Sequence, residues 1–153
     1  MFRIVLLEPE IPQNTGNIAR LCAATGVELV LVGRLGFSID DKHLKRAAMD
    51  YWHHATITHI KTLDEYFSQN NTFYAISTKG HKRYTEINIK YNEPIDIIYG
   101  SEGAGLPEFM YSQYSNQLYR IPMKNELRSL NLASSVSIVS YYLLHKMNFP
   151  DLF

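Results

Sequence analysis

The sequence predicts an α/β fold in which a mostly parallel sheet is covered by helices on both faces. Short apolar runs alternate with stretches of helical periodicity, and this alternation is typical of sheets built from strand–helix–strand units. The connections are short, and no internal repeat, low-complexity segment or linker interrupts the pattern. Residues 1–153 are therefore expected to form a single compact domain, long enough to bury a core.

The predicted strands are short apolar segments, and the first of them, FRIVLL, has the composition of a buried strand. Strands are expected at residues 2–7, 28–33, 55–60, 72–78, 94–100 and 116–123.

The predicted helices begin and end at characteristic residues. Asn14 or Thr15 is expected to cap the first helix, and Gly26 is expected to end it. Thr62 and Glu65 have the spacing of a capping box. Helices are expected at residues 14–26, 40–52, 62–70 and 130–147.

Composition excludes several classes of protein. Hydrophobic residues make up 46% and charged residues 20%, as in ordinary globular proteins, and no run of 18 apolar residues predicts a membrane-spanning helix. The N-terminal apolar run is too short for a signal peptide. Lone Cys22 excludes an intramolecular disulfide and a cysteine zinc cluster, so we expect no metal and a cytoplasmic location.

The formal net charge is zero, which does not by itself indicate a nucleic-acid partner. Local charge matters more, and residues 79–84 (KGHKRY) and 43–54 (HLKRAAMDYWHH) form two basic segments. Each is equally well explained as solvated surface or as a phosphate-binding patch.

A glycine loop follows a predicted strand unusually late in the chain, in the segment IIYGSEGAGLPEF (97–109). Gly100, Gly103 and Gly105 are in the order GxxGxG, so the loop matches neither the GxGxxG dinucleotide fingerprint nor a phosphate-binding P-loop. Glycines allow backbone groups to approach a flat ligand such as a nucleoside, although a simple turn would use glycines too. Glu102 could accept hydrogen bonds from such a ligand or from the loop's own amides.

Two further segments carry polar residues at predicted helix starts. In IPMKNELRSLNLASS (121–135), residues 121–123 form an apolar edge beside Ser129 and Asn131. This combination suits an adenosine, whereas Ser129 and Asn131 taken alone are ordinary helix caps. In EPEIPQNTGNIARL (8–21), Asn14 and Arg20 lie near the start of the first helix, and a lone arginine on a helix is usually a surface charge.

The last predicted helix has a second face of small and aromatic residues, Ser134, Ser137 and Tyr141, beside its apolar stripe. Small residues allow a second helix to approach closely, and tyrosines are favoured at interfaces. This face predicts either an exposed semipolar surface or the contact of a homodimer.

Together, three motifs resemble those of the SPOUT (SpoU–TrmD) RNA methyltransferases. They are N-x-G-x-x-x-R at residues 14–20, YGSEGAGL at 99–106, and IPM…RSLNL at 121–132. The resemblance spans nearly the whole chain. It is strongest to the minimal TrmL or YibK type, tRNA 2′-O-methyltransferases of the wobble nucleotide. That choice rests on the absence of an appended RNA-binding domain and on Arg128, where the wider family usually has an acid.

The resemblance implies a deep C-terminal trefoil knot that contains an S-adenosylmethionine site, which would explain why the glycine loop comes so late. It implies transfer of a methyl group to the ribose 2′-hydroxyl of cytidine or uridine 34 in tRNA, in leucine tRNAs, without a metal. It also implies a homodimer whose contact includes the first and last helices with Tyr141.

The site residues implied by the resemblance fall into three groups. Arg20 would bind the nucleotide's phosphate and stabilise the developing alkoxide, Asn14 would orient Arg20 or the ribose, and Ser129 would contact cofactor or substrate. Phosphate contacts with the RNA would come from Arg20, Lys79, Lys82 and Arg83. The cofactor would be surrounded by Thr78, Gly100, Glu102, Gly103, Leu106, Ile121, Met123, Ser129 and Leu130.

Two other classes of function remain open from the sequence. One is a knotted RNA- or nucleotide-binding protein without methyl transfer, although Asn14, Arg20 and Glu102 are all intact. The other, weaker one is a dinucleotide-dependent oxidoreductase, which the order of the glycines disfavours.

Overall fold

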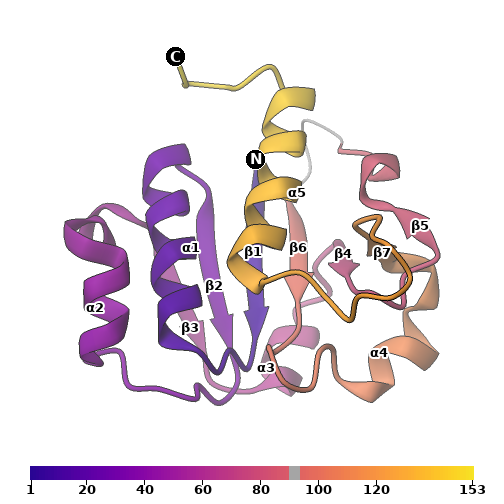
Figure 1. Ribbon diagram of the computed structural model, residues 1–153, viewed down its shortest axis with the longest axis horizontal. Coiled ribbons are helices and arrows are strands. Elements are labelled where there is room, and N and C mark those ends of the chain that lie inside the picture. The colour runs from indigo at the N-terminus through magenta and orange to yellow at the C-terminus, as the bar shows by residue number, and fades with distance from the viewer. Residues whose placement is uncertain (90–93) are drawn as a thin grey trace.

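A computed structural model, which describes residues 1–89 and 94–153, contains a seven-stranded sheet in the order β3-β2-β1-β6-β4-β7-β5 (Figure 1). All the paired strands are parallel, so the predicted parallel α/β fold is confirmed. The strands are β1 (Phe2–Leu7), β2 (Glu28–Val32), β3 (Ile57–Ile60), β4 (Phe73–Ile76), β5 (Lys82–Arg83), β6 (Ile95–Tyr99) and β7 (Leu118–Arg120).

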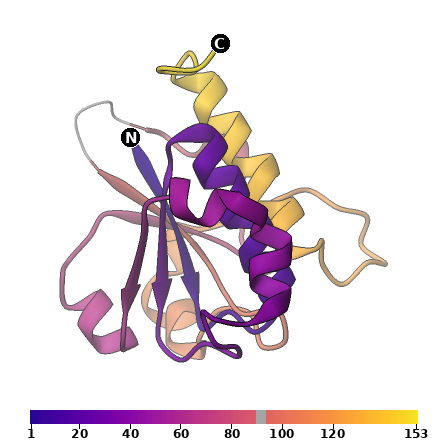
Figure 2. The same cartoon turned by 90° about the vertical axis from the view of Figure 1, so that its left-hand side faces the viewer.

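Helices cover both faces of the sheet, as predicted. Two buried clusters lie on opposite faces, one beneath α1 and α5 and the other beneath α3 and α4, and α2 packs against the outside of α1 (Figures 1 and 2). The helices are α1 (Pro12–Thr25), α2 (Lys42–Ala48), α3 (Leu63–Phe67), α4 (Glu108–Gln113) and α5 (Leu132–Lys146), with 3-10 turns at Met49–His54, Tyr84–Glu86 and Ser115–Gln117.

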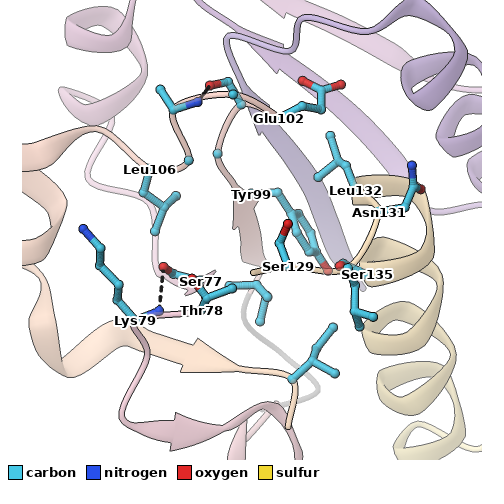
Figure 3. Close-up of a pocket in the computed structure, with 18 of the residues that line it drawn as sticks. Ser77, Thr78, Lys79, Tyr99, Glu102, Leu106, Ser129, Asn131, Leu132 and Ser135 are labelled. Atoms are coloured by element: carbon cyan, nitrogen blue, oxygen red, sulfur yellow. Dashed lines mark hydrogen bonds between the residues drawn. The ribbon is translucent and has the colours of Figure 1, made fainter. Parts of the chain in front are cut away.

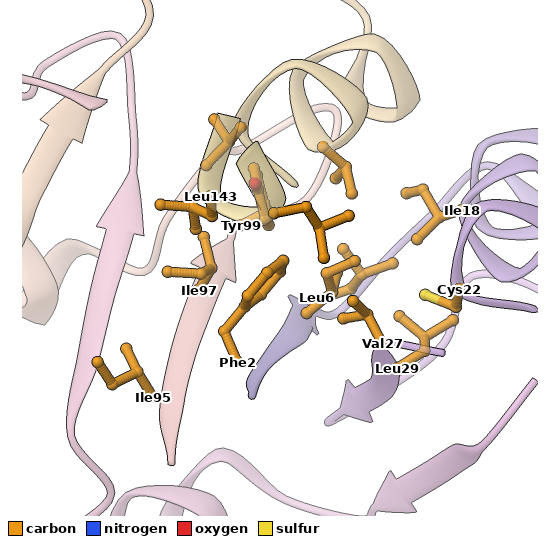
Figure 4. Close-up of a cluster of buried hydrophobic side chains, with 14 of the residues drawn as sticks. Phe2, Leu6, Ile18, Cys22, Val27, Leu29, Ile95, Ile97, Tyr99 and Leu143 are labelled. Atoms are coloured by element: carbon orange, nitrogen blue, oxygen red, sulfur yellow. The ribbon is translucent and has the colours of Figure 1, made fainter. Parts of the chain in front are cut away.

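Strand alternation divides the core between these two faces. In β1, Phe2, Ile4 and Leu6 point toward α1 and α5, whereas Val5 and Leu7 point to the other face. Figure 4 shows the first cluster, in which strand side chains meet the apolar faces of α1 and α5. The position of α5 over the sheet is thus set by the same apolar stripe that predicted the helix.

One charged residue is buried in the opposite face. Asp96 in β6 is 1% exposed and accepts two hydrogen bonds from the Arg3 guanidinium, at 2.7 and 2.9 Å. The Tyr66 hydroxyl donates a third to Asp96, at 2.6 Å. These contacts connect β1, β6 and α3 on the face away from α5.

Several predicted boundaries are wrong in detail. Helix α1 begins at Pro12 with Ile11 at its N-cap, so neither Asn14 nor Thr15 caps it. Proline is favoured in the first turn because its missing N–H would be unpaired there anyway. Gly26 does end the helix, in the left-handed conformation at φ 72°. At the last helix Asn131 is the cap, accepting from the Ser134 N–H, and Ser129 is not.

The elements at the edges of the molecule differ more from the predicted ones. The helix expected at residues 40–52 is shorter, as α2, and continues as a 3-10 turn. The predicted strands at 55–60 and 72–78 shorten to β3 and β4, and the basic segment after β4 contains a short edge strand, β5. Thr62 accepts from the Glu65 N–H, which confirms the N-terminus of α3.

The topology brings three distant segments to one edge of the sheet. β6, β4 and β7 are neighbours and parallel, so the segments that follow them leave at the same carboxyl edge. Ligands of open parallel sheets bind at this edge, where the strand order changes direction. Within the described residues, no helix is long and apolar enough to cross a membrane.

Candidate active site

A cavity of about 460 Å³ lies at the carboxyl edge of β6, β4 and β7 (Figure 3), within the usual size range of small-molecule sites. Five parts of the chain line it, namely the start of α1, the segment after β4, the glycine loop after β6, helix α4, and the segment that leads from β7 into α5. The lining residues are Ile11, Asn14, Ile76–Lys79, Tyr99–Leu106, Tyr111, Ile121, Met123, Ser129–Leu132 and Ser135.

The glycine loop is closed by its own backbone. The Ser101 N–H donates to the Gly105 carbonyl at 3.1 Å, and the Gly105 N–H donates to the Ser101 carbonyl at 2.9 Å. A Cβ on Gly100 would lie 2.1 Å from the backbone carbon of Gly105, so the loop cannot close with a larger residue there. Gly100 is therefore needed for the shape of the loop itself, whether or not it also allows a ligand to approach the backbone.

The cavity combines apolar and polar walls. Leu106, Ile121, Met123, Leu130 and Leu132 supply apolar surface. Thr78, Ser129, Asn131 and Ser135 supply hydroxyl and amide groups, and the glycine loop supplies backbone polar groups. This set fits the adenosine of S-adenosylmethionine, whose flat base favours burial and whose edges form hydrogen bonds.

Lys79 brings positive charge to the cavity. Its ammonium lies 4.4 Å from the centroid of the Tyr111 ring, close enough for a cation–π contact. The Tyr111 hydroxyl is 3.3 Å from the Ser77 hydroxyl, which also accepts the Lys79 N–H at 3.2 Å. Ser77 and Tyr111 thereby connect the segment after β4 to α4.

A chain of side-chain hydrogen bonds joins the three sequence motifs. The Asn131 amide donates to the Asn14 carbonyl oxygen at 2.9 Å, and the Asn14 amide donates to Glu102 at 3.1 Å. Glu102 also accepts the N–H groups of Glu10 and Ile11, at 2.8 and 3.1 Å. Its carboxylate is thus occupied by the start of α1, while Asn14 is 6% exposed.

Among the residues that the structure describes, Arg20 does not line the cavity, so it lies outside the cavity of its own chain. It is exposed on α1, and its guanidinium carbon is 5.0 Å from the centroid of the Tyr51 ring. The Asn14 side chain faces Glu102 and Asn131, so its hydrogen bonds are directed toward the cavity wall.

The other three predicted RNA-binding residues are divided between two places. Lys79 lines the cavity, whereas Lys82 and Arg83 lie on β5 at the edge of the sheet. The Lys82 ammonium donates to the Asn116 carbonyl at 3.0 Å and lies 5.5 Å from the centroid of the Tyr119 ring. Both β5 residues are exposed.

Two buried groups in the core beneath α1 and α5 have altered acidity. Burial raises the pKa of the Cys22 thiol to about 12, so this cysteine is not a reactive thiolate at neutral pH. Burial also raises the pKa of Tyr99 well above its ordinary value. Tyr99 points beneath α5 (Figure 4), and its hydroxyl has no hydrogen-bond partner among the described residues.

All residues predicted to surround the cofactor line this one cavity, and Asn14 and Lys79 join them. Sequence patterns did not indicate Tyr111, Ser77 or Ser135 as part of the site. Ser77 and Ser135 adjoin predicted site segments, so proximity in sequence could have indicated them. Tyr111 is on α4, and only the packing of α4 against the sheet brings it to the cavity.

The chain is similar to known RNA methyltransferases. The family model for the SpoU rRNA methylase family matches residues 1–141. A tRNA (cytidine(34)-2′-O)-methyltransferase of Saccharophagus degradans is 42% identical, with 97% of each chain covered.

Solved structures are similar as well. One concerns the 2-OH methylation of C/U34 on tRNA and has a TM-score of 0.89 at 34% identity, with 97% of each chain covered. An AdoMet-bound rRNA methyltransferase from Sinorhizobium meliloti has a TM-score of 0.83 at 27% identity, covering 95% of this chain and 56% of that one. The chain belongs to the SpoU rRNA methylase family.

Proposed function

We propose that this protein is an S-adenosylmethionine-dependent tRNA 2′-O-methyltransferase that acts on the wobble nucleotide, cytidine or uridine 34, in leucine tRNAs. The observation that carries the proposal is the convergence of the glycine loop, the segment after β4 and the segment before α5 on one cavity. The Saccharophagus relative supports the choice of nucleotide. A tRNA substrate also implies a cytoplasmic location.

S-adenosylmethionine supplies an electrophilic methyl group when it is bound. Leu106, Ile121, Met123 and Leu130 would bury its base, and the other cofactor residues would be Thr78, Gly100, Glu102, Gly103 and Ser129. Since Glu102 already accepts three hydrogen bonds from the start of α1, its contribution is to hold the glycine loop in position. Ser129 is exposed at the cavity, where it can contact cofactor or ribose.

Arg20 is the proposed catalytic residue. A guanidinium stays protonated, so it acts by binding the nucleotide's phosphate and stabilising the developing alkoxide, not by accepting the proton. Asn14 fixes the first turn of the helix that carries Arg20, through its bonds to Glu102 and Asn131. Lys79, Lys82 and Arg83 would bind further phosphates of the tRNA.

A homodimer would complete this site. Arg20 lies on α1, outside the cavity of its own chain, and α1 packs beside α5 (Figures 1 and 2). On α5, Ile138 and Tyr141 are 38% and 49% exposed, which leaves apolar surface for a partner. In the dimer, Arg20 of one subunit would face the substrate of the other, and Tyr141 would lie at the contact.

The C-terminal segment is proposed to form a trefoil knot. Residues 121–132, which follow β7, share a cavity with the segments after β4 and β6. This close association of late and earlier segments is the arrangement that threading of the C-terminal segment would produce. The cofactor would then bind against the knotted region itself.

A methyl-transfer assay tests the proposed function. Purified protein is incubated with labelled S-adenosylmethionine and tRNA from a strain that lacks this modification, and the tRNA is digested to nucleosides. We expect 2′-O-methylated cytidine or uridine at position 34, reduced by at least about a hundredfold in Arg20→Ala. The exposed variant Lys61→Ala is the control and should retain activity.

The other outcomes are distinct. Label at another ribose would refute the choice of nucleotide while retaining the chemistry. Binding of S-adenosylhomocysteine without label would refute methyl transfer to these tRNAs and favour an RNA-binding protein. Binding of NAD in place of S-adenosylhomocysteine would refute the cofactor.

A further inference from the structure

Two carboxylates connect the glycine loop and the start of α1 in opposite directions. Glu102, in the loop, accepts the N–H groups of Glu10 and Ile11, at 2.8 and 3.1 Å. Glu10 in turn accepts the Gly103 N–H at 3.0 Å. Each segment therefore supplies both a carboxylate and an amide to the other, which fixes their separation at two points.

The Glu102 side of this connection continues into the rest of the site. Glu102 also accepts from Asn14, and Asn14 accepts from Asn131, the cap of α5. Glu10 makes the reciprocal contact, from the segment between β1 and α1 to the tip of the glycine loop. Hydrogen bonds that involve a carboxylate are stronger than those between neutral groups, so this contact can determine the loop's conformation.

The position of Glu10 distinguishes it from the residues that line the cavity. Glu10 is exposed and is not among the described lining residues, whereas Gly103 is. A Cβ on Gly103 would lie 2.8 Å from the Glu10 Oε2, so the loop backbone and this carboxylate are in close contact. Glu10 can therefore affect the cavity wall without touching a bound molecule.

We infer that Glu10 is a positioning residue for the cofactor, which holds the Gly103 amide and so keeps the glycine loop in its binding conformation. The inference rests on the proposed function, because it takes S-adenosylmethionine as the occupant of the cavity. Without the Glu10 carboxylate, the loop populates other conformations, and cofactor binding must restore the competent one. Replacing Glu10 should therefore lower the affinity for the cofactor more than it lowers turnover at saturating cofactor.

The experiment compares S-adenosylhomocysteine binding by calorimetry in the full-length protein and its variants. Glu10→Ala should raise the Kd about tenfold, whereas Glu10→Gln, whose amide oxygen can still accept from Gly103, should stay within about threefold. In the methyl-transfer assay, the KM for S-adenosylmethionine should rise with the Kd, while kcat stays within about threefold. Glu108→Ala, which removes an exposed acid from α4, is the matched control and should bind like the wild type.

The outcomes separate this inference from the proposed function. Absence of S-adenosylhomocysteine binding in the wild-type protein would refute the cofactor itself. If the wild type binds and Glu10→Ala binds equally well, the positioning role is wrong, even if the variant unfolds at a lower temperature. A Glu10→Gln variant as weak as Glu10→Ala, or a fall in kcat without a rise in KM, would also overturn it.

Discussion

At the scale of single residues, Asp96 shows how a buried charge is stabilised within the sheet. It lies on β6 at a position where the strand faces α3, and Arg3 and Tyr66 donate three hydrogen bonds to it. The pKa of Arg3 is raised, chiefly by its hydrogen bond to Asp96. Removing one member of such a group leaves a buried polar group with fewer hydrogen bonds, which costs more than the group's net contribution.

We predict that Asp96→Ala lowers the free energy of unfolding by about 2–4 kcal/mol, and that Tyr66→Phe lowers it by about 1 kcal/mol. The values can be measured by urea unfolding at pH 7, followed by fluorescence of Trp52. Because Arg3 is partly exposed, it should contribute less to the free energy of unfolding than a fully buried arginine would. A loss below about 0.5 kcal/mol in Asp96→Ala would contradict this account.

Tyr66 should also affect stability at alkaline pH. Burial and the charge of Asp96 raise the pKa of Tyr66 far above the ordinary value of 10.0. The folded state therefore keeps this proton when the unfolded chain releases it, so stability is complete below pH 10 and falls as the pH rises above it. Above pH 10, the free energy of unfolding should therefore fall less steeply with pH in Tyr66→Phe. The slope should be smaller by about 1.4 kcal/mol per pH unit, which corresponds to one proton.

The individual site residues could be predicted, whereas their partners could not. Glu102 was expected to accept from a ligand or from its own loop, but it accepts from Glu10, Ile11 and Asn14. Such partners are about ninety positions away in the chain, and only folding determines which distant amide meets a carboxylate. The motif identifies the residue, and the tertiary contact defines its role.

At the scale of elements, the glycine loop has to reverse direction within a few residues after β6. Gly100 allows the backbone to pass close to Gly105, and Gly105 adopts φ 74°, in the left-handed region. The loop's shape is thus encoded locally. Its position against α1 is set by Glu10 and Glu102.

We predict that Gly100→Ala abolishes measurable S-adenosylhomocysteine binding, because its Cβ would lie 2.1 Å from the Gly105 backbone and force the loop open. Calorimetry and thermal unfolding would measure binding and stability together. Gly26→Ala is the control, since it strains a left-handed residue by about 1–2 kcal/mol at the end of α1, where a Cβ meets nothing within 4 Å. Gly26→Ala should be less stable but should bind normally. Normal binding by Gly100→Ala would contradict the proposed loop geometry.

The start of α1 shows where local signals compete. Asn14 is a good capping residue, yet the helix begins two residues earlier, at Pro12. Proline's fixed φ favours the first turn, and the Asn14 side chain is then available for Glu102 and Asn131. Sequence propensity alone could not rank these two uses of Asn14.

At the scale of the whole molecule, a neutral chain has to bind a polyanion. The formal net charge is zero, so attraction to tRNA depends on where the positive charges lie. Lys82 and Arg83 are both exposed on β5, the edge strand of the sheet, which lies next to β7. Lys79 is closer, in the cavity lining.

We predict that replacing Lys82 and Arg83 together by alanine weakens tRNA binding while cofactor affinity stays unchanged. Two lost phosphate contacts should reduce the slope of log K against log [salt] by about 1.5. Filter binding at several salt concentrations would measure this slope, with Lys61→Ala as a single-charge control on the far side of the sheet, after β3. An unchanged affinity and slope would show that the tRNA does not contact β5.

The sequence by itself determined the α/β class, the order of the strands and helices other than β5 and α4, and the segments that carry the site. These features depend on local periodicity, on glycine positions and on motif spacing, all of which are present in the linear chain. The tertiary structure alone decided that α4 brings Tyr111 to Lys79, that Glu10 holds Gly103, and that Arg20 lies outside its own cavity. These depend on which strands become neighbours, because parallel pairing brings residues from distant parts of the chain to one edge, and no local signal specifies that pairing.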